Sequence, residues 1–303
     1  MVRYDKSSAE KGSKYVKDQR RRGGAKPVAA GGGVIGVIVM VLFAVLGGGD
    51  SGQSLNLEDL GFDLGTVPAE SGPVDANQPD PDADTVEFME FLMFDIQETW
   101  QLLFAESDLT YQSTNLTLFT GAVQTGCGRA TSAVGPFYCP APNDQGVYID
   151  LDFFNDLSSR FGAPGDFAQA YVVAHEVGHH IQSVTGISDN TRQAQQQDPA
   201  NKNLYSVRQE LQADCFAGVW AHSANQRLTR ESGQPIIESN DIPEGLEAAA
   251  AVGDDRIQEQ AGMTVDPHTW THGAADQREE WFMVGFNTGN PNNCDTGNVQ
   301  IDN

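Results

Sequence analysis

Residues 171–182 decide how the rest of the chain is interpreted, and they read Tyr-Val-Val-Ala-His-Glu-Val-Gly-His-His-Ile-Gln. His175 and His179 are four positions apart, which places both imidazoles on one face of a helix, one turn apart. Zinc accepts imidazole nitrogen at about 2.0–2.1 Å, so two such rings can share one ion. Glu176 follows the first histidine, where its carboxylate can reach a water bound to that ion and remove its proton. The pattern therefore predicts a zinc site.

The sequence around this motif is typical of a buried helix. We predict a helix that begins near Asp166, a plausible cap, and ends at about Val184. Gly178 costs such a helix about 1 kcal/mol relative to Ala, and a residue this small would let another backbone approach closely. The competing interpretation is a surface helix whose histidines are satisfied by local hydrogen bonds.

A second predicted helix, over about 204–227, offers two carboxylates on one face. Glu210 and Asp214 are four positions apart within an otherwise apolar stretch. Like charges one turn apart destabilise a helix unless a cation compensates, and a metal supplies one. A catalytic zinc site needs a third protein ligand and an open fourth position. We therefore predict Glu210 as that ligand and Asp214 as the acceptor for the free N–H of a ligand histidine. The alternative is a pair of acids on a solvated helix face.

Together the two motifs resemble the bacterial "putative neutral zinc metallopeptidase" family, within the wider gluzincin class. The resemblance is carried by His-Glu-Val-Gly-His-His-Ile-Gln at 175–182 and by Glu-Leu-Gln-Ala-Asp-Cys-Phe-Ala-Gly-Val-Trp-Ala at 210–221. Shorter stretches that also match the family are 125–128, 135–140, 147–150 and 271–278. The resemblance covers nearly all of residues 86–303, and an N-terminal membrane helix is also typical of the family.

What the resemblance implies is an α+β, zincin-like metallopeptidase domain, mostly helical with a small sheet. It implies one catalytic Zn²⁺ with His175, His179 and Glu210 as ligands. Glu176 is then the base, and Asp214 supports a ligand histidine. In zincins the edge strand of the sheet pairs with the extended substrate, so we expect the predicted strand 146–154 to do so. An ordinary core strand is an equally good interpretation of that segment.

Four other histidines need an interpretation. His272 is our candidate for stabilising the oxyanion that forms during hydrolysis, with His268 a weaker candidate and Arg278 near in sequence. The alternative for both is a surface or packing role. His180 and His222 are predicted to be structural.

The remaining elements follow from hydrophobic periodicity. We predict a helix over 88–103, strands over 115–120 and 146–154, a short helix over 153–161, a polar loop over 191–203, helices over 243–260 and 279–286, and a Gly/Asn-rich tail.

The N-terminal part of the chain has its own character. Residues 1–28 hold nine of the 18 Lys and Arg residues, and the 23 residues from Pro27 to Gly49 carry no charge. About 20 apolar residues span a bilayer as a helix, and a basic flank stays in the cytoplasm. We therefore predict a basic cytoplasmic segment at 1–28 and an uncleaved transmembrane anchor at 29–48. The alternatives are a buried core helix and a cleaved signal peptide, although Leu46-Gly47-Gly48-Gly49 is not a clean cleavage site.

Beyond the anchor the chain becomes acidic. Residues 49–85 have no Lys or Arg and are rich in Gly, Pro, Ser and acids, which predicts a disordered linker before the domain at 86–303. The whole chain has a formal net charge of −24 over 303 residues, which argues against nucleic acid as a partner. A hydrophobic content of 39% permits a packed core and excludes wholesale disorder.

The four cysteines all follow the predicted anchor and fit an oxidising compartment. Three connectivities are possible. We favour Cys127 with Cys139, which closes a short loop, and Cys215 with Cys294, which fixes the tail to the second motif helix. Zinc ligation by cysteine is the rival, and no Cys-x-x-Cys supports it.

We therefore expect a single-pass membrane protein whose extracytoplasmic domain hydrolyses peptide bonds of a peptide or protein substrate. In that mechanism Glu176 activates the zinc-bound water and then returns the proton to the leaving amine. The alternatives are a non-catalytic zincin-like scaffold of the cell envelope and a zinc-dependent hydrolase acting on a non-peptide amide. An intact Glu176 favours an enzyme, because a binding module does not need it.

Overall fold

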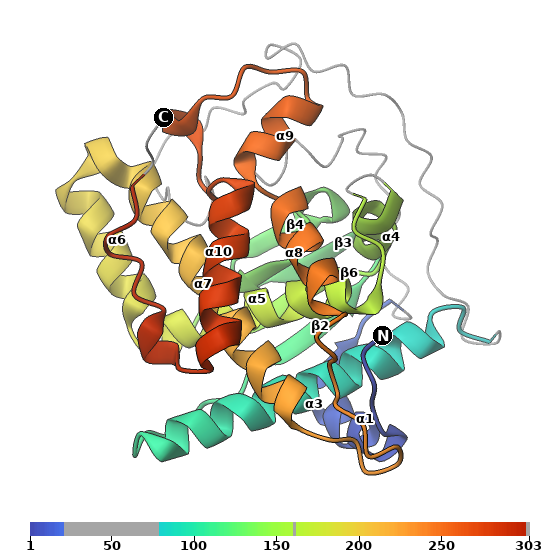
Figure 1. The fold of residues 1–303 in the computed structure, drawn as a ribbon. Coiled ribbons are helices and arrows are strands. Elements are labelled where there is room, and N and C mark those ends of the chain that lie inside the picture. Colours follow the sequence, from blue (N-terminus) through green and yellow to red (C-terminus); the bar gives the residue numbers. More distant parts are fainter. Residues whose placement is uncertain (21–78, 160–161, 301–303) are drawn as a thin grey trace.

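A computed structural model describes residues 1–20, 79–159 and 162–300, which form a mixed α+β structure, mostly helical with a small sheet (Figure 1). Its α-helices are α1 (Lys6–Gly12), α3 (Ala83–Glu106), α4 (Asp152–Ser159), α5 (Asp166–Val184), α6 (Ile187–Gln197), α7 (Lys202–Gln226), α8 (Ile242–Ala251), α9 (Asp254–Gln260) and α10 (Ala275–Thr288). Its strands are β1 (Val16–Asp18), β2 (Asn115–Phe119), β3 (Ala122–Thr125), β4 (Gly128–Thr131), β5 (Phe137–Cys139) and β6 (Gly146–Asp150). Short 3-10 helices are η1 (Ser13–Tyr15), η3 (Ser132–Val134), η4 (Pro199–Asn201), η5 (Pro267–Thr269) and η6 (Pro291–Asn293).

The main sheet has the strand order β1-β2-β6-β5. Strands β1, β2 and β6 are parallel, and β5 runs antiparallel to β6, with Phe137 opposite Tyr148. Every residue of β6 is buried, as expected for an inner strand covered on both faces. The expectation that strand 146–154 is the edge strand is therefore wrong, and the core-strand interpretation holds. The edge next to β6 belongs to β5, which is too short to show a periodic signal in the sequence, and β1 forms the other edge.

Helix α5 lies at the centre of the molecule. It contacts β5 and β6 on one side and α7 and α8 on others, as its place in Figure 1 also indicates. Of its 19 residues, 14 are buried, which excludes a surface helix. The predicted bounds of this helix agree with the observed ones because its cap region, apolar pattern and ending are all local features of the sequence.

Helices α7 and α10 approach each other very closely. A Cβ atom at Gly285 would lie 1.9 Å from the carbonyl oxygen of Cys215, so only glycine fits at this crossing. The close crossing lies in the C-terminal half of α10, against the residue that follows Asp214, and Arg278 in the N-terminal half of α10 donates to Asp214. Packing of α10 therefore determines what surrounds Asp214.

Residues 1–20 are part of this folded unit. Strand β1 pairs with β2, and Ala9 of α1 is buried against the main core. Arg20 is 3% exposed, and its guanidinium lies 2.7–2.8 Å from carboxylate oxygens of Asp18, Asp80 and Asp82. The unit thus includes residues 1–20 and 79–85 in addition to the described residues after 86. Four of the charges that suggested a separate segment and linker, those of Asp18, Arg20, Asp80 and Asp82, instead form an ion cluster.

Two helical predictions need correction. The stretch 191–203 is not a loop, because α6 continues to Gln197 and η4 follows. Its polarity suggested a loop, but Gln, Ala and Arg are good helix formers. In addition, Gln195 is buried and donates to the hydroxyl of Ser206 on α7. The single helix expected over 243–260 is two helices, α8 and α9, separated at Val252 and Gly253.

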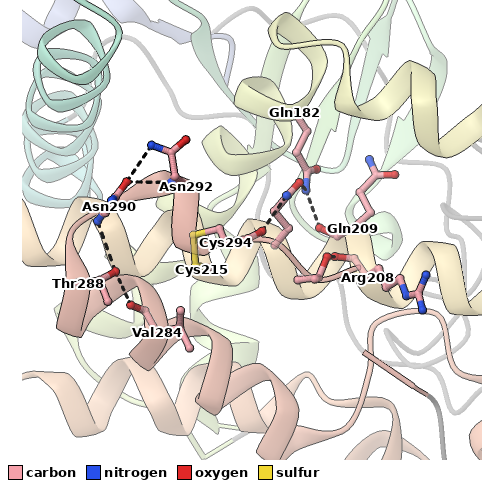
Figure 2. Close-up of a disulfide and its surroundings, with 11 residues drawn as sticks. Gln182, Arg208, Gln209, Cys215, Val284, Thr288, Asn290, Asn292 and Cys294 are labelled. Carbon is pink, nitrogen blue, oxygen red and sulfur yellow. Dashed lines mark hydrogen bonds between the residues drawn. A yellow bond between two sulfur atoms is a disulfide. The ribbon is translucent and has the colours of Figure 1, made fainter. Parts of the chain in front are cut away.

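Both favoured disulfides are present, Cys127–Cys139 and Cys215–Cys294. The second joins α7 to the C-terminal tail after η6 (Figure 2). Gln212 of α7 also donates to the carbonyl oxygen of Cys294 at 2.8 Å. The tail is therefore attached to the helix that carries the second motif by one covalent bond and one hydrogen bond.

In the part of the chain that the structure describes, no helix combines the length and apolar character needed to cross a bilayer. The predicted anchor at 29–48 lies outside the described residues, as does most of the predicted linker.

Candidate metal centre

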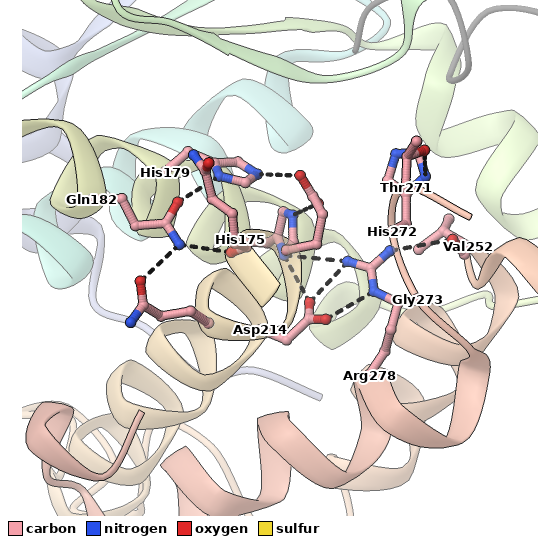
Figure 3. A network of polar contacts seen from close by, with 12 residues as sticks. His175, His179, Gln182, Asp214, Val252, Thr271, His272, Gly273 and Arg278 are labelled. Carbon is pink, nitrogen blue, oxygen red and sulfur yellow. Dashed lines mark hydrogen bonds and ion pairs between the residues drawn. The ribbon is translucent and has the colours of Figure 1, made fainter. Parts of the chain in front are cut away.

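Three predicted ligands meet in one place. The Nε2 atom of His175 lies 3.2 Å from Oε2 of Glu210, and the Nε2 atom of His179 lies 3.4 Å from Oε1 of the same carboxylate. The ligand atoms of all three residues lie within 4.8 Å of one another. Figure 3 shows the two rings side by side, facing the same space. The two histidines spaced four apart on α5 and the glutamate on α7 thus form a single cluster of donor atoms.

The close packing of α5 on α7 makes this possible. A Cβ atom at Gly178 would lie 2.9 Å from the carbonyl oxygen of Ala213, so a larger residue would push the helices apart. Gly178 is one residue before His179, and Ala213 is one residue before Asp214. The inference that Gly178 allows another backbone to approach is therefore confirmed.

The outer nitrogen of His175 is held by Asp214. Its Nδ1 lies 2.7 Å from Oδ1 of Asp214, which is completely buried. The same carboxylate accepts the hydroxyl of Tyr171 and two N–H groups of Arg278, at 2.8 and 2.9 Å (Figure 3). Arg278 also donates to the carbonyl oxygen of Val252 at 3.2 Å. This arrangement leaves the Nε2 lone pair of His175 directed at the centre.

The outer nitrogen of His179 is held by Gln182, a residue that sequence reasoning missed. Its Nδ1 lies 3.0 Å from Oε1 of Gln182, one turn further along α5 (Figure 3). The amide of Gln182 in turn donates to the carbonyl oxygen of Gln209 at 2.6 Å and to Oε1 of Gln212 at 3.1 Å. The spacing of three between His179 and Gln182 is a local signal for this contact. The prediction from sequence considered only a carboxylate, Asp214, as a partner for a ligand histidine, and so it missed this amide.

Opposing effects set the charges of these groups. Burial favours neutral His175, but the carboxylates of Asp214 and Glu210 raise its pKa to about 9. Burial also favours neutral Glu210, yet His179 and His175 hold its pKa well below the ordinary value. The two carboxylates thus require positive charge from their neighbours, which a divalent cation would supply more strongly than a proton.

The distances also fit zinc. Two ligand atoms at 2.0–2.1 Å from an ion in tetrahedral geometry are about 3.3 Å apart. The separations of 3.2 Å from Nε2 of His175 to Oε2 of Glu210 and of 3.4 Å from Nε2 of His179 to Oε1 are close to this value. The three ligand atoms are spread over up to 4.8 Å, so small side-chain movements would bring them around one ion. Two imidazoles and one carboxylate are a donor set that zinc uses with a fourth position open.

A cavity of about 180 Å³ adjoins the cluster, and all three donor residues line it. Glu176 lines the same cavity, next to the two histidines. Burial raises the pKa of its carboxyl group, and His179 and His175 offset this only in part. A carboxylate with a raised pKa is better suited to take up a proton and release it again.

His272 lines the cavity as well, and its ring is fixed by Asp254. Its Nδ1 lies 3.1 Å from Oδ1 of Asp254, whose other oxygen accepts the backbone N–H groups of Thr271, His272 and Gly273. His268 lies elsewhere, exposed on η5, and does not line the cavity. Of the two candidates, only His272 is therefore placed beside the donor cluster.

His180 and His222 are structural, as predicted. His180 is buried between the hydroxyl of Tyr138, at 3.1 Å, and the carbonyl oxygen of Gln112, at 2.6 Å. His222 contacts the carbonyl oxygen of Phe286 at 2.6 Å. Both rings therefore connect elements of the fold rather than face the cavity.

Comparison with known proteins assigns the chain to a family. The family described as "Putative neutral zinc metallopeptidase" matches residues 6–297. The chain belongs to this family. The match extends from α1 to beyond η6, so it includes the N-terminal helix as well as both motif helices of this family member.

Two bacterial relatives are similar over much of their length. "Uncharacterized protein YpfJ" of Escherichia coli (strain K12) is 47% identical over 214 residues, which are 70% of this chain and 71% of that protein. "Uncharacterized protein Mb2605" of Mycobacterium bovis is 50% identical over 190 residues, 61% of this chain and 63% of that protein. No solved structure matches the chain. The family identifies the class of protein, and the reaction has to be inferred from the geometry of the site.

Proposed function

We propose that the protein is a zinc-dependent peptidase, with His175, His179 and Glu210 holding one catalytic ion. The observation that carries this proposal is the convergence of two imidazole Nε2 atoms on the Glu210 carboxylate at 3.2 and 3.4 Å, next to Glu176 in an open cavity. Bound zinc lowers the pKa of water and polarises a carbonyl group. Every other step is carried out by side chains of the chain.

Glu176 is the general base in this proposal. Its carboxylate removes a proton from the attacking water and delivers that proton to the leaving amine. The raised pKa of Glu176 makes it a stronger base for the first transfer than an exposed glutamate would be. Removing the carboxylate while keeping its shape is therefore the sharpest single test of catalysis.

His272 stabilises the oxygen that becomes negative as water adds to the carbonyl. Asp254 holds Nδ1 of the ring, so Nε2 is left to face the cavity. Arg278 does not share this role, because its guanidinium is buried and bound to Asp214 and Tyr171. It keeps Asp214 charged and in place behind His175.

The substrate backbone pairs with β5. This strand is the edge of the main sheet, and residues 134–138 line the cavity beside the donor cluster. An extended peptide can add to such an edge through main-chain hydrogen bonds. The edge-strand role that we expected for 146–154 is therefore proposed for β5 instead.

The experiment that tests the function uses the full chain with one equivalent of zinc and a mixed peptide library. We expect cleavage by the wild type, and none after chelation or in Glu176→Gln at matched zinc content. Zinc binding without cleavage of any peptide would favour the non-catalytic scaffold. Cleavage of simple acyl amides but no peptide would favour a hydrolase of non-peptide amides. Failure to bind zinc would overturn the metal site.

We also propose that the domain functions outside the cytoplasm. The two disulfides support this, because such bonds persist in oxidising compartments. The contacts of residues 1–20 with the domain are incompatible with a single span that leaves 1–28 in the cytoplasm. Labelling of intact cells with a membrane-impermeant amine reagent should modify Lys6, whose side chain is 80% exposed. Modification only after lysis would contradict an external domain.

A further inference from the structure

The cavity at the metal centre contains an arginine that the proposed mechanism does not use. Arg192 lines the cavity, as does Arg278. Arg278 is 2% exposed, and its guanidinium is engaged with Asp214 and with the carbonyl oxygen of Val252. The side chain of Arg192, by contrast, is 41% exposed. Among the described residues that line the cavity, Arg192 is therefore the one Arg or Lys able to meet a ligand.

Helix α6 holds Arg192 in the wall of the cavity. It begins three residues after α5 ends and lies against both α5 and α7 (Figure 1). Ser188, one turn before Arg192 on α6, also lines the cavity and is 7% exposed. Its hydroxyl accepts a side-chain N–H of Gln209, which directly precedes Glu210 on α7. Residues four apart share one face of a helix, so the face of α6 that carries Arg192 is turned towards the donor cluster.

The guanidinium of Arg192 is only weakly bound within the chain. Its partner is Asp189, one turn earlier on α6, whose side chain is 67% exposed and does not line the cavity. An ion pair as exposed as this contributes little free energy, so another carboxylate can replace Asp189 at small cost. A guanidinium carries five N–H donors in a planar fork, and the contact with Asp189 uses one nitrogen. Arg192 can therefore bind a carboxylate of a ligand through two parallel hydrogen bonds.

The charge of the cavity also favours an anionic ligand when zinc is bound. The carboxylates of Glu176 and Glu210 balance the charge of one Zn²⁺. Arg192 adds a positive charge that no further carboxylate among the described lining residues offsets. Outside the cavity the chain is acidic, with 42 Asp and Glu residues against 18 Lys and Arg. A short-range contact with Arg192, rather than the long-range field of the protein, would therefore select such a ligand.

We infer that Arg192 binds a carboxylate group of the peptide substrate, so that the enzyme acts on anionic peptides. This inference depends on the proposed peptidase function and identifies its substrate class. The carboxylate belongs either to an Asp or Glu side chain or to the C-terminus of the peptide, and the chemistry of recognition is the same. Hydrogen bonds that include a charged group change affinity by about ten- to hundredfold, which is the preference that we expect.

Affinity selection tests this inference without turnover. The full chain with Glu176→Gln is loaded with zinc, immobilised and incubated with a peptide library of balanced composition, made once with free and once with amidated C-termini. Mass spectrometry identifies the retained peptides. We expect peptides that bear a carboxylate to be enriched at least about tenfold, and Arg192→Gln in the same background to abolish the enrichment.

The two forms of the library separate the two sources of the carboxylate. Enrichment that depends on a free C-terminus assigns Arg192 to the terminal carboxylate, and enrichment of Asp and Glu in both forms assigns it to side chains. No enrichment, or an enrichment that Arg192→Gln leaves unchanged, would overturn the inference. In the second case the metal rather than Arg192 would hold the carboxylate.

Arg256→Gln is the matched control. Arg256 is exposed on α9 and does not line the cavity, so this variant removes the same charge and should leave the enrichment unchanged. Equal losses in the two variants would show that net charge alone acts and would contradict a contact. The zinc-loaded wild type is then assayed on the same libraries. Cleavage that is independent of carboxylates overturns the role of Arg192 alone, whereas Arg192-dependent retention without cleavage overturns the peptidase and leaves the carboxylate site in place.

Discussion

Oε1 of Gln182 lies 3.0 Å from Nδ1 of His179, in the position that Asp214 occupies for His175. The two ligand histidines are therefore oriented by different means. His175 depends on a carboxylate from α7, whereas His179 depends on an amide from its own helix. Both contacts place the ring proton on Nδ1 and leave Nε2 free for a metal. The two histidine ligands are thus oriented by Asp214 and Gln182, which contact the ring nitrogen opposite the metal position.

The contact of Gln182 with His179 predicts a weaker metal site when it is removed. Gln182→Leu should lower zinc affinity by about 10- to 100-fold, because the imidazole loses the acceptor that fixes its orientation. Gln182→Glu keeps an acceptor and should retain most of the affinity. Titration against a chelator of known affinity measures both variants. Equal losses in the two would show that the acceptor does not matter and that packing alone is affected.

The buried pair of Asp214 and Arg278 predicts a large loss of stability when one partner is removed. Asp214→Ala leaves the guanidinium of Arg278 buried without its counter-charge, which costs about 3–5 kcal/mol. The double variant Asp214→Ala with Arg278→Met should recover part of that loss. Denaturant unfolding of the metal-free proteins measures the free energies. A single variant within 1 kcal/mol of the wild type would contradict the pairing.

The contact between Asp254 and His272 predicts a specific pH dependence. Burial raises the pKa of Asp254, but the charge of His272 and the backbone N–H groups lower it by more, so the net shift is downward. A group with a lowered folded-state pKa stabilises the fold above its unfolded value of about 3.9, and this contribution disappears as the pH falls. The stability difference between wild type and Asp254→Asn should therefore shrink as the pH falls below about 4. A difference that grows on acidification would be the wrong sign.

Much of the site was predictable because it depends on helical spacing. His175, His179, Glu210 and Asp214 are each recognisable from positions four apart on two helices, and their side chains do meet. What was not predictable depends on contacts between distant segments. The edge strand β5 has three residues, and its position follows from the sheet order rather than from any local pattern.

The N-terminal segment shows the same limit. Arg20 is one of a run of basic residues, and nothing local indicates that Asp80 and Asp82 would bury it. Gln182 likewise becomes meaningful only when its partners on α7 are in place. Charged and polar residues were therefore misinterpreted as exposed or unimportant where their partners lie far away in the sequence.

Arg20 provides a test of whether residues 1–20 are part of the folded unit. Arg20→Ala leaves the carboxylates of Asp18, Asp80 and Asp82 close together without their shared cation, so the purified chain should unfold at a lower temperature. Arg129→Ala, which removes an exposed arginine side chain from β4, is the composition-matched control. An unchanged midpoint for Arg20→Ala would indicate that the segment is separate from the domain, as a cytoplasmic segment of a single-span protein would be.

The two disulfides should differ in what they contribute. Cys215 and Cys294 are 79 residues apart, and Cys127 and Cys139 are 12 apart. Loop-closure entropy alone gives about 4.5 kcal/mol for the longer loop and about 2.8 kcal/mol for the shorter one. Replacing Cys215 and Cys294 by Ser should therefore cause the larger loss in unfolding free energy. Replacing Cys127 and Cys139 should mainly lower peptide cleavage, because Cys139 ends the edge strand beside the cavity.

The longer disulfide should also affect the metal. Cys294 accepts a hydrogen bond from Gln212, Gln212 accepts one from Gln182, and Gln182 holds His179 (Figures 2 and 3). A tail released from Cys215 would weaken this series of contacts, so the variant lacking Cys215–Cys294 should bind zinc less tightly than the variant lacking Cys127–Cys139. Chelator competition on both double-serine variants, under conditions where both remain folded, makes the comparison. Equal zinc affinities would show that Gln182 orients His179 without help from the tail.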